Sequence, residues 1–174
     1  MSNEIYKSLD SKQIEKLLTQ KKDNTLFEIY SLLRKEKAID ETFLKFELDL
    51  RHEKLKPQFS LVYEKINGKL TLIAVATEYT YHSTKKKQEL FHLHDLTISK
   101  EHRTEQLEID LLNYVSKKCK KQGFLNLNIN LDKRLESILR KIIIQKKQRS
   151  SHLIGKNTTQ KVATNRAIKT LHLK

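Results

Sequence analysis

Apolar residues recur at helical spacing near the start of the chain. Asp10 or Ser11 can cap a short helix, because their side-chain oxygens accept hydrogen bonds from the first backbone N–H groups. Its apolar face would hold Ile14, Leu17 and Leu18. Asn24 can cap a second helix with the same spacing. The apolar residues of that helix are Leu26, Phe27, Tyr30 and Leu33.

The segment from Thr42 to Arg51 fits two patterns. Apolar and charged residues alternate strictly along it, which is typical of a half-buried strand. Asp40 as a cap, with Phe43, Phe46 and Leu50 at helical spacing, permits a helix instead. The pattern alone leaves both open.

The centre of the chain indicates an antiparallel meander. Phe59–Ile66 is a predicted strand, and Asn67-Gly68 follows it as a two-residue turn in which both positions need positive φ. Leu70–Tyr81 returns as a second strand rich in Thr, Val, Ile and Tyr. After a polar turn over Ser83–Gln88, Leu90–Ser99 is a third strand.

A strand–helix–strand pattern leads into the C-terminal part. Glu105–Lys121 is a predicted helix that ends at Gly123, and Phe124–Asn130 alternates as a strand. Asp132 opens a further helix. Its apolar residues are Leu135, Ile138, Leu139 and Ile142. Weak strands are expected at His152–Gly155 and Thr170–Leu173, and the pattern assigns nothing to 156–169.

This order of elements predicts an α+β fold with one mixed sheet in a single domain spanning 1–174. It comprises an N-terminal helical part over 1–55, a central sheet over 58–130, and a C-terminal helix with short strands over 131–174.

Charge and cysteine content narrow the classes of protein. The net charge of +14 favours a polyanionic partner such as nucleic acid, or a solvated lysine-rich surface. The single Cys119 excludes an internal disulfide and fits the cytoplasm or another reducing compartment, such as an organelle stroma. The sequence shows no apolar run long enough for a membrane span and no Cys/His spacing typical of a metal site. Cys119, on the apolar face of its helix, is predicted to be a core residue.

The stretch Leu93–Asn130 resembles the central motif of the GNAT N-acetyltransferase superfamily. Leu96 and Ile98 fill the strand positions, and Arg103 falls at the first basic position of the R-x-x-G-x-G turn. Gly123 and the following strand come at the expected distance. The resemblance implies a GNAT-like acyl-CoA N-acyltransferase fold.

The same resemblance implies acetyl-CoA, or another acyl-CoA, as cofactor. The backbones of Leu96, Thr97 and Ile98 would hold pantetheine, and the turn and helix start would hold the pyrophosphate with unpaired N–H groups. The residues of that turn are Arg103, Thr104, Glu105, Gln106, Leu107 and Glu108. The turn is degenerate, because Gln106 and Glu108 stand where the family has glycines.

The strand before this turn resembles that of the aralkylamine N-acetyltransferases, with His92-Leu93-His94 in place. That family uses the two histidines as the general base, acting through water, and an imidazole near its ordinary pKa suits the task. Alternation places Asp95, a second candidate base, on the opposite face of the strand. The tyrosine that protonates the leaving thiolate in the superfamily would fall near Leu139, so the general acid is missing there.

The resemblance therefore implies an N-acetyltransferase acting on an amine, either a small molecule or a protein N-terminus or lysine. The alternatives are a GNAT-like domain that has lost catalysis and binds a partner, and a basic nucleic-acid- or ribosome-associated protein. Sequence favours the third class least, since no RNA-binding aromatic motif is present.

Overall fold

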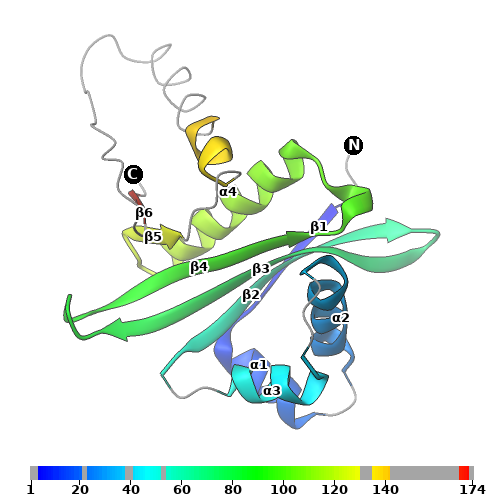
Figure 1. Cartoon of the computed structure of the whole chain (residues 1–174), viewed down its shortest axis with the longest axis horizontal. Coiled ribbons are helices and arrows are strands. Elements are labelled where there is room, and N and C mark those ends of the chain that lie inside the picture. The colour runs from blue at the N-terminus through cyan, green and yellow to red at the C-terminus, as the bar shows by residue number, and fades with distance from the viewer. Residues whose placement is uncertain are drawn as a thin grey trace.

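The computed structural model describes residues 4–20, 23–37, 41–51, 54–129, 135–141 and 169–172. Its elements follow an order of strand, three helices, three strands, helix and two strands (Figure 1). They are β1 (Glu4–Leu9), α1 (Ser11–Thr19), α2 (Thr25–Lys37), α3 (Phe43–Leu50), β2 (Lys56–Ile66), β3 (Lys69–Ser83), β4 (Gln88–Ile98), a 3₁₀ turn (Lys100–His102), α4 (Glu105–Lys121), β5 (Asn126–Ile129) and β6 (Lys169–His172).

The strands form one sheet in the order β1-β2-β3-β4-β5-β6. All neighbouring strands are antiparallel except β4 and β5, which are parallel. The helices α1, α2 and α3 cover one face of this sheet, and α4 covers the other (Figure 1). The predicted α+β fold with a mixed sheet is confirmed.

The N-terminal helices begin where side chains can cap them. Asp10 accepts a hydrogen bond from the Gln13 N–H, and the Gln13 side-chain oxygen accepts one from the Asp10 N–H, at 2.8 Å each. The ambiguous segment is the helix α3, and its cap is Thr42, whose hydroxyl accepts from the Lys45 N–H at 3.2 Å. Asp40 is therefore not the cap, and it lies outside the described residues. Phe46 and Leu50 are buried while Leu44 and Leu48 are exposed. A strand would place all four on one face, so this split decides for the helix.

The apolar pattern of the sequence does not predict the edge strand β1. It pairs antiparallel with β2, from Glu4 opposite Glu64 to Leu9 opposite Phe59. Its residues are only half-buried or exposed, so little apolar alternation marks it. Long-range pairing with β2, rather than local preference, sets this element.

The antiparallel meander is confirmed, with strands one to three residues longer than their apolar cores suggested. Asn67 and Gly68 turn the β2–β3 hairpin with φ values of 50° and 81°. Both values lie in the left-handed region that the predicted turn demands.

The helix α4 has the bounds that its pattern predicts. Gly123 follows it with a φ of 87°, the left-handed conformation that commonly ends helices. The strand after it is shorter than predicted, and Leu125, which lies before β5, is 78% exposed.

The C-terminal predictions are confirmed only in part. Residues 135–141 are helical, with Leu135, Ile138 and Leu139 buried. The expected last strand corresponds to β6. Predictions on Asp132, Ile142 and His152–Gly155 lie outside the described residues.

A buried polar network attaches α4 to the sheet. Glu78 on β3 is fully buried, and its carboxylate pairs with the Lys118 ammonium of α4 at 2.7 Å. The Ser60 hydroxyl of β2 donates to the same carboxylate at 2.5 Å, and Lys118 also donates to the Phe59 carbonyl. Buried charges need such partners, so this network fixes where α4 lies.

Candidate functional site

Among the residues that the structure describes, no strand pairs with the outer edge of β4 in its C-terminal half, and this is the open edge of β4. Its pairing with β5 runs only from Phe91 opposite Leu127 to Leu93 opposite Ile129. On the other side, β3 pairs with β4 as far as Ile98. The Ser99 N–H donates to the Ile73 carbonyl at 2.8 Å, so the antiparallel alternation turns the backbone groups of Leu96 and Ile98 away from β3. These groups face the open edge.

A β-bulge lies at the start of this edge. Leu93 pairs with Glu78 and Asp95 with Thr77, so His94 is an extra residue on β4. The side chains of Phe91 and Leu93, and then of Leu96 and Ile98, all join the core under α4. The bulge therefore shifts the alternation by one residue.

This shift corrects the expected placement of Asp95. Strict alternation would set Asp95 opposite the two histidines, but its carboxylate forms an ion pair with Lys37 of α2, on the face covered by the N-terminal helices. The rings of His92 and His94 lie on that face as well, with centroids 6.5 Å apart. All three predicted catalytic residues thus share one face of β4.

Two tyrosines of β3 surround the histidines. The Tyr79 ring lies edge-on to His94 at 5.7 Å, and the Tyr81 ring lies edge-on to His92 at 6.5 Å. The Nδ1 atom of His92 is buried, with no hydrogen-bond partner among the described residues. Burial, and then the neighbouring His94, lower the pKa of His92, so its imidazole is neutral at neutral pH and can accept a proton.

Tyr79 is a functional candidate that the sequence did not reveal. Burial raises its pKa, and the nearby carboxylates of Asp49, Glu41 and Asp95 raise it further. The phenol therefore keeps its proton and can act as a donor. Its strand was predicted, but the contact with His94 depends on register across a bulge, which leaves no local sequence signal.

The start of α4 presents backbone N–H groups toward the end of the open edge. Thr104 caps the helix, and its hydroxyl accepts from the Leu107 N–H at 3.1 Å while its carbonyl accepts from Glu108. An α-helix leaves the N–H groups of its first residues, here Glu105 and Gln106, without helical partners. Glu108, at a glycine position of the resembling motif, is 5% exposed.

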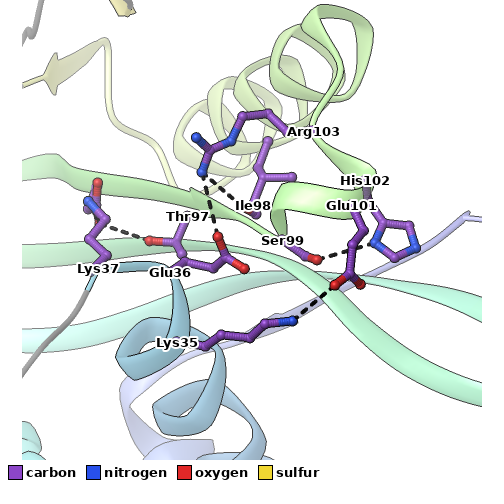
Figure 2. A network of polar contacts seen from close by, with 10 residues as sticks. Lys35, Glu36, Lys37, Thr97, Ile98, Ser99, Glu101, His102 and Arg103 are labelled. Carbon is purple, nitrogen blue, oxygen red and sulfur yellow. Dashed lines mark hydrogen bonds and ion pairs between the residues drawn. The ribbon is translucent and has the colours of Figure 1, made fainter.

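Polar contacts from the last turn of α2 surround the end of β4 (Figure 2). The Arg103 guanidinium donates to the Ile98 carbonyl at 3.0 Å and lies 4.0 Å from the Glu36 carboxylate. Lys37 pairs with Asp95, whose carboxylate also accepts from the Thr97 hydroxyl at 3.0 Å. The turn after β4 and the end of α2 thus form one polar cluster.

Other predicted features lie away from this cluster. Leu139, where the superfamily tyrosine would fall, is buried in the core. Cys119 is also buried, as predicted, and desolvation followed by the charge of Glu78 raises its pKa to about 12, which keeps the thiol protonated. Within the described residues no group of side chains is arranged to hold a metal ion.

Solved structures with this fold include several acetyltransferases. One chain of the NatC complex bound to Gag peptide and CoA matches with a TM-score of 0.58 and 10% identity, over 80% of this chain and 83% of that one. A GNAT family acetyltransferase of Staphylococcus aureus matches with a TM-score of 0.51 and 13% identity, over 95% and 100%. An aminoglycoside acetyltransferase from an uncultured soil sample, in complex with sisomicin, matches at 0.51 and 10%, over 94% and 97%.

These matches show that the chain has the GNAT-like fold expected from the Leu93–Asn130 motif. No family model and no curated protein matches the sequence. Among the helices that the structure describes, none is long and apolar enough to cross a membrane.

Proposed function

We propose that this protein is an acetyl-CoA-dependent N-acetyltransferase that acts on an amine. The observation that carries the proposal is the open edge of β4, which begins at the bulged His94 and ends beside the first turn of α4. Solved structures with the same fold include acetyltransferases, and one of them contains CoA.

The cofactor would bind along this edge. Pantetheine amides would pair with the outward-facing backbone groups of Leu96 and Ile98, as an added strand does. The pyrophosphate would lie at the N–H groups of Glu105 and Gln106, where the helix dipole favours negative charge. Arg103 would add a positive charge if its guanidinium turned from the Ile98 carbonyl to the phosphate.

The acyl transfer would proceed by direct attack. His92 or His94 takes a proton from the acceptor ammonium, directly or through a water molecule, and the free amine attacks the thioester carbonyl. The C–N bond forms, the C–S bond breaks, and the thiolate leaves with the electron pair. Tyr79, with its retained proton, would protonate that thiolate, and the resulting phenolate would take the second proton that the nitrogen loses as it becomes the amide. Asp95 would stabilise the charged imidazole or the incoming ammonium.

The experiment is a thiol-release assay with acetyl-CoA and a panel of primary amines. Wild-type protein should release CoA with at least one amine, and His92→Gln/His94→Gln should lower kcat by roughly a hundredfold or more, the usual contribution of a general base. His82→Gln is the matched control, because this exposed histidine lies on the opposite face of β3 from Tyr79 and Tyr81, which contact the two histidines. Unchanged activity in the double variant would remove the histidines from the mechanism.

A GNAT-like domain without catalysis is the second candidate. It is favoured by the two acidic residues in the first turn of α4, Glu105 and Glu108, at a place where a pyrophosphate would need to bind. Calorimetry separates the two candidates, because failure of acetyl-CoA to bind at high micromolar concentration would exclude the acetyltransferase proposal. Binding of nucleic acid with a steep salt dependence would then support the basic-surface alternative.

A further inference from the structure

A buried carboxylate ends the sheet-facing side of α2. Ile29 and Leu33 lie on this side of the helix, and Glu36 continues it one turn later. The Glu36 side chain is only 1% exposed. A negative charge in the last turn of a helix also opposes the helix dipole, so neither burial nor position favours a carboxylate here.

The Glu36 carboxylate is also unsatisfied in the part of the chain that the structure describes. Neither carboxylate oxygen has a hydrogen-bond partner within the described residues. Among the described residues, the cation that pairs with Glu36 is Arg103 at 4.0 Å, and that guanidinium donates to the Ile98 carbonyl at 3.0 Å. Buried polar groups are almost always hydrogen-bonded, so the carboxylate is placed to receive a donor that the described part of the chain does not supply.

The next residue shows what kind of group fits nearby. The Lys37 ammonium lies on the Asp95 carboxylate, immediately after the bulged His94. Lys37 comes from the surface and is 39% exposed, so this pair can exchange with an ammonium from solution at little cost. The side chain of Lys37 thus occupies the place that an acceptor ammonium would take.

We propose that Glu36 and Asp95 form a two-carboxylate site that selects an acceptor with two cationic groups, such as a linear diamine. This inference rests on the proposed function. Asp95 would hold the ammonium that reacts beside the histidines, in place of Lys37. Glu36 would hold the second ammonium near Ile98. Ile98 lies three residues beyond Asp95 on β4, which is about 10 Å along the strand. A basic protein would otherwise repel such a molecule, so these carboxylates supply the local attraction.

Calorimetric titration of the full chain in the presence of CoA tests the site without turnover. The probes are hexamethylenediamine and hexylamine, which differ by one ammonium group. The wild type should bind the diamine at least about tenfold more tightly, the value of one charge-assisted hydrogen bond. Glu36→Gln should abolish that preference, and Lys37→Ala should strengthen diamine binding because the competing ammonium is gone.

The matched control is Lys35→Ala, since this exposed lysine of the same turn pairs with the exposed Glu101 and should change neither probe. If Glu36→Gln weakens CoA binding but keeps the diamine preference, Glu36 only positions Arg103 and the proposal is wrong. Equal binding of both probes by the wild type also overturns it. Circular dichroism checks folding, and Asp95→Asn, expected to weaken both probes, replaces Glu36→Gln if that variant unfolds.

The two proposals can fail separately. If CoA does not bind, the acetyltransferase proposal is lost, and the probes are titrated against the protein alone. A diamine preference that depends on Glu36 would still support the two-carboxylate site.

Discussion

Loss of the Lys118 ammonium should destabilise this protein more than any surface change. Lys118→Met keeps most of the side-chain volume but leaves the Glu78 carboxylate buried without its cation. The Ser60 hydroxyl, at 2.5 Å, remains as a hydrogen-bond donor. The fold would keep its shape, because α4 still packs on the sheet through Leu111, Leu112 and Val115.

The expected cost follows from the burial of the pair. Glu78 is 0% exposed and the Lys118 side chain 9%, so water cannot replace the lost partner. Breaking one side of such a pair costs about 3–5 kcal/mol, a large part of the ~5–15 kcal/mol that stabilises a domain. Glu78→Leu/Lys118→Met removes both charges and should recover most of that loss, apart from about 1 kcal/mol for the Ser60 hydroxyl.

The protonation of Glu78 predicts how the free energy of unfolding changes with pH. Burial raises the pKa of Glu78, although Lys118 and Ser60 act to lower it. The folded state therefore holds the proton more tightly than the unfolded state, and stability falls as the pH rises above the ordinary carboxyl range. Without Lys118 the pKa rises further, so the deficit of Lys118→Met should be larger at about pH 8 than at about pH 5.

Urea unfolding followed by circular dichroism measures these differences. The conservative Lys120→Met, near the exposed end of the same helix, is the control and should cost less than about 0.5 kcal/mol. A loss below about 1 kcal/mol for Lys118→Met, equal at both pH values, would refute the buried-pair reasoning.

Three further results are expected. Because the pKa of His92 is lowered from its ordinary value of 6.5, kcat/KM should fall at acidic pH with an apparent pKa below 6.5. This fall should disappear in His92→Gln. An apparent pKa above 6.5 would exclude His92 as the base. Tyr79→Phe should lower kcat roughly tenfold to a hundredfold at unchanged acetyl-CoA affinity, in a single-turnover assay, while Tyr81→Phe serves as the neighbouring control. Gly68→Ala should lower the free energy of unfolding by about 1 kcal/mol. The cost comes from the φ of +81°, which a residue with a Cβ rarely adopts, and not from a clash, since no atom lies within 4 Å of the added Cβ. A neutral result would contradict the turn assignment.

Local sequence signals predicted much of the fold. Asn67-Gly68 determines its hairpin because few other residue pairs adopt both positive φ values, and α4 has a cap, a long apolar stripe and a terminal glycine. The edge strand β1 and the choice between strand and helix at Phe43–Leu50 depend instead on partners distant in sequence. Alternating Leu and charged residues fit either structure until burial selects one.

The site was predicted less completely than the fold. The motif predicted the histidines and the turn at Arg103 as candidates, and they stay predictions, while the bulge at His94 reversed the expected face of Asp95. A bulge arises from the pairing of two strands and has no signature in one of them. Glu36 and Tyr79 come from other elements, and only tertiary packing brings them to β4.

An amide NMR titration with acetyl-CoA tests the central claim most directly. If the cofactor binds along the open edge of β4, the backbone N–H signals of Leu96, Ile98, Glu105 and Gln106 should shift together and saturate with one affinity. No shift at these four amides, or shifts confined to the lysine-rich turn at 85–87, would contradict a cofactor site on this edge.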